Sequence, residues 1–227
     1  MASSGSNYSA HGAGVYCSYS SPTLTNCTIS GNTAIPSGNV VSSGGGLCCY
    51  SNSSPTLTMC TISDNTAYMG GGVICDSDSN PTLINCTISE NSVSGDGGGM
   101  ECISANPTLA NCTISRNRAS YHGAGIDCEK SSPTLTNCTI IANAVPSGPG
   151  GGVECDYSSS PTLTNCTISG NTASSYGGGV RCYSSSSPTL TNCILWADTP
   201  QEIYVSSGTP VVRSDNQDDQ GAQARAV

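Results

Sequence analysis

The sequence has no phenylalanine, a single tryptophan and only six basic residues among its 227. Charged residues make up 9% of the chain and the formal net charge is −9. Because no basic cluster exists, nothing in the chain can neutralise a phosphate backbone, so nucleic acid is not an expected partner. No apolar run approaches the roughly 18 residues needed to cross a bilayer, and we expect no transmembrane segment. The first ten residues show neither the positive nor the apolar region of a secretory signal.

Small and polar residues take the place of the missing ones, with 27 Gly, 12 Pro and 15 Cys. Such a composition without a period would predict disorder. Here the unit GGGVxCxxSSPTLTNCTISxNTA recurs seven times, and internal repetition of this length is typical of solenoids. The tripeptide Pro-Thr-Leu begins at Pro22, Pro55, Pro81, Pro107, Pro133, Pro161 and Pro188, at spacings of 26 to 33 residues. The longest spacing reflects an insertion near residues 35–43, which we expect to form an outer loop.

Each unit has the pattern of short strands joined by tight corners. Apolar residues lie two apart, as in Val15 and Cys17, which is the period of a strand with one buried face. Gly triplets and a proline in every unit exclude helix. We therefore predict an all-β, single-domain parallel β-helix (β-solenoid) of about seven coils stacked at about 4.8 Å. The predicted divisions are a polar leader (1–10), the seven-coil β-helix (11–198), a divergent C-terminal coil or cap (199–213) and a polar tail (214–227).

Stacking places equivalent residues in columns. The predicted core columns are Leu24, Leu57, Leu83, Leu109, Leu135, Leu163 and Leu190; Ile29, Ile62, Ile88, Ile114, Ile140, Ile168 and Ile194; and Val15, Leu47, Val73, Met100, Ile126, Val153 and Val180. A polar column holds Asn32, Asn65, Asn91, Asn117, Asn143 and Asn171, with Asp198 in the seventh position. We interpret it as an internal asparagine ladder that satisfies corner backbone groups.

The phrases GGGVxC, SSPTLTNCTISGNTA and NCILWADTPQEIYVSSGTPVV resemble bacterial surface proteins with right-handed parallel β-helix repeats. That group is related to the polymorphic outer-membrane protein repeats and to secreted proteins with C-terminal anchors. The resemblance covers residues 11–212. It implies a right-handed helix, secretion or surface display, and often adhesion, but no defined chemistry.

The cysteines form two further columns and leave one over. The columns are Cys17, Cys49, Cys75, Cys102, Cys128, Cys155 and Cys182, and Cys27, Cys60, Cys86, Cys112, Cys138, Cys166 and Cys193. These fourteen could form disulfides within a coil or between adjacent coils. They could equally stay as a ladder of buried free thiols. Cys48 falls in a slot that we expect to face outward. It is a candidate for an intermolecular disulfide, or else a tolerated surface cysteine. Zinc is not expected, because no CxxC and no Cys/His pairing occurs.

Carboxylates recur in the slot between the valine column and the first cysteine column, which we expect to face outward. The acidic patch comprises Glu101, Asp127, Glu129, Glu154 and Asp156. Carboxylates one coil apart could bind Ca²⁺ or share a proton as general acid and base. Without long loops around them or a Lys or Arg among them, we interpret the patch as a solvated face. We therefore expect no catalysis, no cofactor and no metal.

Two histidines and four tyrosines can be considered as site residues, and none indicates a specific chemistry. His11 and His122 both precede a Gly-Ala-Gly turn, and we assign them to turns. Tyr19, Tyr50, Tyr157 and Tyr183 project near the acidic face, as ordinary surface residues or as platforms for sugar rings.

The favoured function is an extracellular structural or adhesive rod whose partner is itself, through head-to-tail stacking. Solenoids need capped ends to prevent edge pairing, and the first coil begins without an evident cap. The alternative is a carbohydrate-binding module that recognises surface glycans. Several β-helix families are polysaccharide lyases or hydrolases, and an enzyme of that kind is the third hypothesis.

Overall fold

The computed structural model describes residues 10–11, 14–34 and 42–213. The predicted leader (apart from its last residue), most of the predicted insertion and the polar tail lie outside the described residues, as does the side chain of His11. Strands and turns account for the described chain, and no helix there is long and apolar enough to span a membrane.

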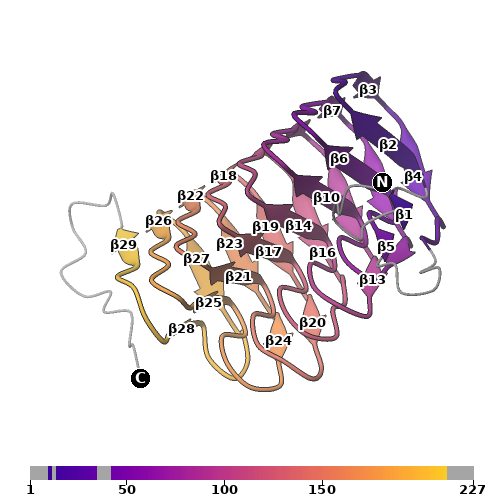
Figure 1. Ribbon diagram of the computed structural model, residues 1–227. Helices are drawn as coiled ribbons and strands as arrows, with labels where there is room; N and C mark the ends of the chain where they lie inside the picture. Colours follow the sequence, from indigo (N-terminus) through magenta and orange to yellow (C-terminus); the bar gives the residue numbers. More distant parts are fainter. Residues whose placement is uncertain (1–9, 12–13, 35–41, 214–227) are drawn as a thin grey trace, which may run out of the picture.

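Three parallel sheets run the length of the molecule (Figure 1). The first sheet contains β2 (Val15–Ser18), β6 (Leu47–Tyr50), β10 (Val73–Asp76), β14 (Met100–Ile103), β17 (Ile126–Glu129), β21 (Val153–Asp156), β25 (Val180–Cys182) and β28 (Ile203–Val205). The second contains β3 (Thr23–Thr25), β7 (Thr56–Thr58), β11 (Thr82–Ile84), β15 (Thr108–Ala110), β18 (Thr134–Thr136), β22 (Thr162–Thr164), β26 (Thr189–Thr191) and β29 (Val211–Arg213). The third contains β4 (Thr28–Ser30), β8 (Thr61–Ser63), β12 (Thr87–Ser89), β16 (Thr113–Ser115), β19 (Thr139–Ile141), β23 (Thr167–Ser169) and β27 (Ile194–Trp196).

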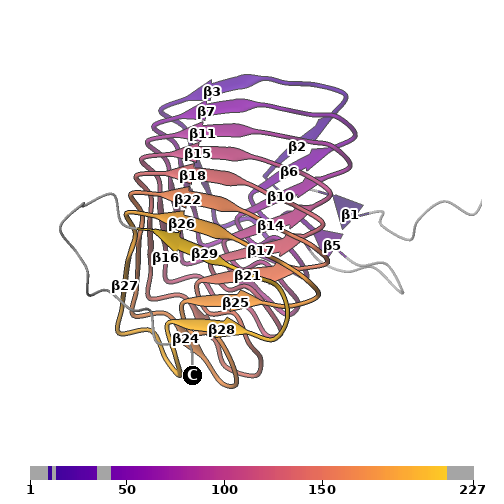
Figure 2. The ribbon, with the colours of Figure 1, turned by 90° about the vertical axis from the view of Figure 1, so that its left-hand side faces the viewer.

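Short two-residue strands make a fourth side, with β9 (Thr66–Ala67) beside β13 (Ser92–Val93) and β20 (Ala144–Val145) beside β24 (Thr172–Ala173). The pair β1 (Ala10–His11) and β5 (Ser42–Ser43) lies further along the coil, where Ser43 bridges to Met69. Figure 2 shows successive coils lying one above another, with the last one, which carries β28 and β29, smaller than the rest. The predicted all-β parallel solenoid is confirmed.

Strand register confirms the stacked columns. Leu83 pairs with both Leu57 and Leu109, and the leucine column continues in the same way to Leu190. These side chains lie in one continuous buried core with the isoleucine and valine columns and the inward cysteines. Like-on-like stacking therefore supplies the apolar burial that stabilises the rod.

The isoleucine column was predicted wrongly at its last position. Ile168 pairs with Leu195, while Ile194 pairs with Thr167 and is 61% exposed. The seventh unit reads Cys-Ile-Leu where the others have Cys-Thr-Ile, so its isoleucine comes one residue earlier. Because a strand has a period of two, a one-residue offset turns a side chain to the opposite face.

The asparagine ladder is present and continuous. Asn91 Nδ2 donates to Asn117 Oδ1 at 2.9 Å and to the carbonyl of Ile62 at 3.1 Å, and the backbone N–H of Asn91 donates to the same Oδ1 at 3.0 Å. The pattern runs from Asn32 to Asn171, which donates to Asp198 Oδ1 at 2.9 Å. Each buried amide therefore has its donors and acceptor satisfied by neighbouring coils.

The two cysteine columns also follow the strand register, with Cys75 stacked between Cys49 and Cys102. All fifteen cysteines are free thiols, and most are buried. In the second column, Cys112 Sγ donates to the carbonyls of Ala110 and Leu83. This arrangement is the thiol ladder, and the disulfide alternative stays a prediction for oxidised protein. Cys48 is buried, so the prediction of a surface cysteine was wrong.

Residues 199–213 extend the stack. In this segment β28 pairs with β25 of the first sheet, and β29 pairs with β26 of the second.

Candidate functional site: an acidic pocket beside the first sheet

The slot that we expected to face water is buried. Glu101 and Glu154 are 2% exposed and Asp127 is 5% exposed. The covering element is the turn that carries the first glycine of each triplet, which has a positive φ (68° at Gly97 and 54° at Gly123). A Cβ placed on Gly123 would lie 2.5 Å from Asp127 Cβ, so the turn packs directly on the side chain four residues later. Only glycine fits there on grounds of both space and conformation.

A small second core holds these turns in place. It consists of Ala34, Ala67, Val93, Ala119, Ala124 and Val145, all buried. The loops between this cluster and the first sheet are short, yet they fold back along the outer face of the sheet. The expectation of a solvated face failed because strand alternation gives a side chain's direction but not what covers it.

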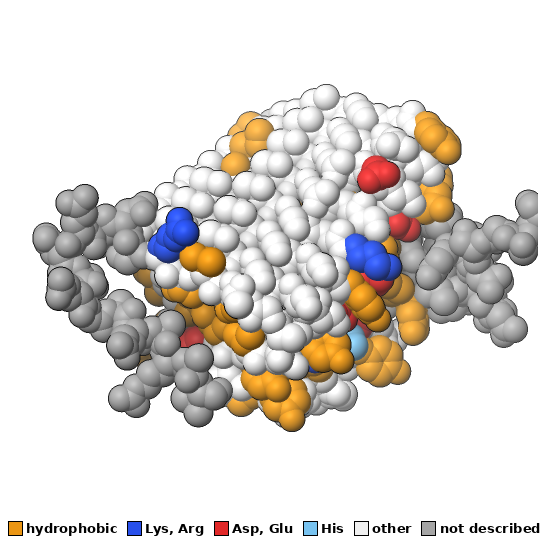
Figure 3. Space-filling model, turned by 60° about the vertical axis from the view of Figure 1, so that its left-hand side comes forward, with side chains coloured by type: hydrophobic (Ala, Val, Ile, Leu, Met, Phe, Trp, Pro, Cys, Tyr) orange, Lys and Arg blue, Asp and Glu red, His pale blue; other side chains and the backbone are white. Residues whose placement is uncertain are grey.

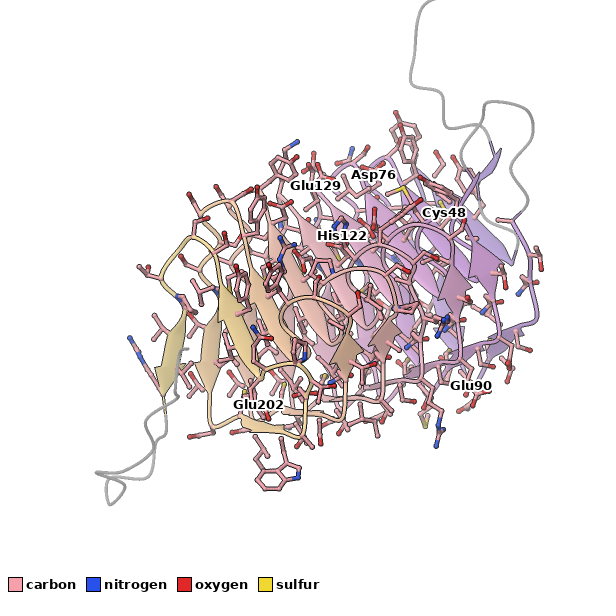
Figure 4. The ribbon with its side chains drawn as sticks, turned by 90° about the horizontal axis from the view of Figure 1, so that it is seen from below. Cys48, Asp76, Glu90, His122, Glu129 and Glu202 are labelled. Atoms are coloured by element: carbon pink, nitrogen blue, oxygen red, sulfur yellow. The ribbon has the colours of Figure 1, made fainter. Side chains whose placement is uncertain are left out.

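A pocket of about 220 Å³ lies between the turns and the sheet. Its lining residues are Met69, Asp96, Glu101, His122, Asp127, Glu129, Glu154, Asp156 and Tyr157. In Figure 3 the single pale blue histidine lies among red and orange side chains, on a surface that is otherwise largely white. In Figure 4 the labelled His122 and Glu129 lie on the same side of the molecule, away from Glu90.

All five residues of the predicted acidic patch line this pocket. Register places Asp127 between Glu101 and Glu154, while Glu129 pairs with Asp156. The five acids therefore lie together as predicted, but they line a partly enclosed pocket and not the solvated face that we expected.

Two residues that line the pocket lie outside the predicted acidic patch: Asp96, and His122, for which the sequence predicts a turn role. His122 Nδ1 lies 3.0 Å from Asp96 Oδ1. Asp96 precedes Gly97 and His122 precedes Gly123, so they occupy equivalent positions 26 residues apart. The repeat itself would have placed them side by side in adjacent coils.

Burial dominates the electrostatics of the carboxyl groups. It raises the pKa of Glu101 well above the ordinary value, and the neighbouring charges of Asp127 and Asp96 add to the effect. Burial raises the pKa of Asp127 in the same way, reinforced by Glu154. Burial also raises the pKa of Glu154, to about 8, although Arg181 opposes the shift. The Asp96 carboxylate raises the pKa of His122 by accepting its hydrogen bond. Burial therefore favours the protonated forms of Glu101 and Asp127, whereas the contact with Asp96 favours the charged imidazole of His122.

Cations reach only part of the pocket. Arg181 forms an ion pair with Glu154, and Lys130 lies 3.4 Å from Glu129. The expectation that no Lys or Arg accompanies the acids was therefore wrong at this end. Within the described chain, no Lys or Arg forms an ion pair with the other four acids, which are Asp96, Glu101, Asp127 and Asp156.

Of the four tyrosines considered for sugar stacking, Tyr157 lines the pocket. Lys130 Nζ lies 5.4 Å from the centre of its ring, and the guanidinium of Arg181 lies 4.8 Å from that of Tyr183. Both rings therefore already have a cation over one face.

Comparison with known proteins gives one match. Residues 4–160 and 120–219 match the family described as the right handed beta helix region. No curated protein and no solved structure matches the chain. The family includes enzymes, such as pectate lyases and hydrolases, as well as proteins without catalytic activity, so the match does not decide between them. The matched segments together cover most of the sequence, and the described strands form the expected parallel stack. The chain belongs to the right-handed β-helix family.

Proposed function

We propose that the protein is an extracellular structural or adhesive rod that assembles head to tail through the strand edges of its first and last described coils. The carrying observation is that the three sheets end in strands whose outer edges no described strand covers. The extracellular role is supported by the resemblance of the repeats to those of secreted and surface-displayed bacterial proteins.

Backbone geometry at the first coil supports stacking. The carbonyl of Cys27 accepts a hydrogen bond from the Thr61 N–H at 2.9 Å, in the second coil. The N–H of Thr28 belongs to the same trans peptide as that carbonyl, so it points the opposite way. The same argument applies to Thr23, because the carbonyl of Pro22 accepts from the Thr56 N–H at 3.0 Å. Exposed strand edges of this kind are templates for another chain.

The last coil offers a complementary edge with apolar side chains. Trp196, Ile194, Val205 and Val212 are all exposed around β27, β28 and β29. Val205 and Val212 pair with the inward Cys182 and Leu190, so they leave part of the core exposed at the end of the stack, which favours an interaction there. A second copy whose first coil continues the parallel register would pair both edges and cover part of this surface.

The proposal is tested by sedimentation and electron microscopy of the full chain over a range of concentrations. Wild type should form longer rods as concentration rises, whereas Thr28→Pro, which removes the outward N–H, should reduce the association constant by at least tenfold. Thr28→Ala keeps the N–H and should assemble like wild type. Circular dichroism verifies that each variant is folded. Concentration-independent monomers of the wild type, or equal assembly of Thr28→Pro, would refute stacking.

A second candidate is supported by the pocket. Buried acids beside Tyr157 are suited to a carbohydrate-binding module, or to a polysaccharide lyase or hydrolase with a raised-pKa acid. A glycan array identifies the ligand, and turnover of any bound polysaccharide is compared between wild type and Asp127→Asn. Absence of binding across the array would exclude this function.

A further inference from the structure

We infer that Asp96, His122 and Asp127 form a binding site for a divalent first-row transition metal ion, of the Zn²⁺ or Mn²⁺ class. One ligand atom from each residue lies within 4.8 Å of the other two. Donor atoms about 2.0–2.2 Å from such an ion lie roughly 3–4.4 Å from one another. The three side chains therefore already converge to nearly the separation that an ion needs.

The present contact shows how an ion would enter. His122 Nδ1 and Asp96 Oδ1 are 3.0 Å apart, joined by one hydrogen bond. The side chain of His122 is about half exposed, so the site opens to solvent on this side. Loss of the imidazole proton would allow a metal ion to bind between the imidazole and the carboxylates.

The buried carboxylate of Glu101 is an independent indication of a ligand. Glu101 lines the same pocket, is 2% exposed, and its Oε2 has no hydrogen-bond partner. Buried carboxyl oxygens are normally paired, hydrogen-bonded or bound to a metal, because an unpaired one has lost its water without compensation. Register places Glu101 beside Asp127, so a cation held by Asp127 would also stabilise Glu101.

The charge balance points the same way. Arg181 and Lys130 pair with Glu154 and Glu129. Asp96, Glu101, Asp127 and Asp156 then share the pocket with only one further cationic group, His122. When these carboxyl groups ionise to bind a divalent ion, the ion supplies the positive charge that stabilises their carboxylate forms.

Ligand chemistry selects the class of ion. Oxygen-only sites suit Ca²⁺ and Mg²⁺, whereas an imidazole among carboxylates favours Zn²⁺, Mn²⁺ and their neighbours. None of the residues lining the pocket is a cysteine. Zinc bound by cysteine thiolates would therefore lie outside this pocket, and spectroscopy distinguishes sulfur ligands from oxygen and nitrogen ligands. No zinc motif is visible in the sequence because the ligands come from two coils, 26 residues apart.

The test measures Zn²⁺ binding to reduced, metal-free full-length protein by calorimetry at pH 7.5. We expect one ion per chain at this site, and a decrease in affinity of at least tenfold in His122→Ala and in Asp96→Asn. Glu90→Gln is the matched control, since Glu90 is exposed on a different side of the rod and should leave binding unchanged (Figure 4). Circular dichroism verifies that each variant is folded. Because the His122 side chain is about half exposed, we expect its replacement to leave the fold intact.

X-ray absorption at the zinc edge identifies the ligands without any assay of activity. A first shell of oxygen and nitrogen, with the multiple-scattering signature of one imidazole that disappears in His122→Ala, supports the site. Sulfur ligands, unchanged affinity in His122→Ala, or Ca²⁺ binding as tight as Zn²⁺ would each overturn it. These outcomes are independent of whether the rod stacks.

Discussion

Replacing Asp198 by asparagine should stabilise the end of the rod, and more so at high pH. Asp198 ends the asparagine ladder, and its Oδ1 accepts bonds from the backbone N–H (2.7 Å) and Nδ2 (2.9 Å) of Asn171. Its other oxygen, Oδ2, is buried without a partner. The final step of the ladder therefore lacks the donor that every other step has.

Glycine geometry places this oxygen where the amide nitrogen belongs. A Cβ on Gly72 would lie 2.9 Å from Asn91 Nδ2, and a Cβ on the equivalent Gly179 would lie 2.8 Å from Asp198 Oδ2. Elsewhere the nitrogen at this position donates to an isoleucine carbonyl, as Asn171 Nδ2 does to Ile140 at 3.0 Å. When Asp198 is unprotonated, its Oδ2 is an acceptor in the place where the other coils have an N–H donor facing a backbone carbonyl, so no hydrogen bond can form there.

The sign of the pH dependence follows. Burial, with a contribution from Glu202, raises the pKa of Asp198 from 3.8 to about 7. Between those values the folded state binds more protons than the unfolded state, so the stability of the wild type falls as pH rises from about 4 to about 7. A paired donor adds about 0.5–1.5 kcal/mol, and relief of an unsatisfied buried oxygen about 1–3 kcal/mol. Since solvent near the last coil screens part of this, we expect Asp198→Asn to stabilise by about 1–3 kcal/mol at pH 8.5.

The measurement is urea unfolding at pH 4.5 and 8.5, with hydrogen exchange of peptides covering β26–β29 as the local readout. Asn143→Asp is the mirror variant and should lose stability at pH 8.5, while the exposed Asp64→Asn should change nothing. An Asp198→Asn variant that is less stable at pH 8.5, or whose gain is equal at both pH values, would refute this account of the ladder.

Two further predictions concern the covering turns and the thiols. Gly123→Ala should lower the free energy of unfolding in urea by more than about 2 kcal/mol, because the new Cβ would meet Asp127. Gly170 also has a positive φ but open space around it, so Gly170→Ala should lower the free energy of unfolding by only about 1 kcal/mol. In native protein purified without reductant, Ellman's reagent should react readily only with the half-buried Cys27 and Cys193, and unfolding should release all fifteen thiols; a lower total would establish disulfides.

The sequence predicted the interior of this protein well because the interior repeats. Leu83 stacks on Leu57 and Asn91 on Asn65 for the same reason, which is that a fixed unit length brings equivalent positions of successive coils together. Where the unit changed by one residue, at Ile194, reading the pattern by residue type gave the wrong face. Counting from Cys193 rather than matching isoleucines would have identified Leu195.

The pocket could be predicted only in part. Strand alternation correctly grouped Glu101, Asp127 and Glu154, but it could not show that the Gly97 and Gly123 turns cover them. Covering depends on a positive φ and on the absence of a Cβ, and a glycine triplet alone does not tell which glycine has which conformation. The His122–Asp96 contact was missed because the histidine was compared with His11, rather than with the residue one unit earlier.

Variation within the repeat separates what the fold requires from what it does not. Inward columns keep one chemical character from coil to coil, aliphatic, thiol or asparagine, whereas the covered outward slot runs through tyrosine, cysteine, isoleucine, three acids and arginine. Since the same turn covers this slot in successive coils, an apolar residue such as Ile74 fits it without electrostatic cost. Three buried acids in consecutive coils instead raise the cost of folding through desolvation and mutual repulsion. A residue choice that the fold does not need, and that opposes stability, is the kind expected of a binding site rather than of a structural one.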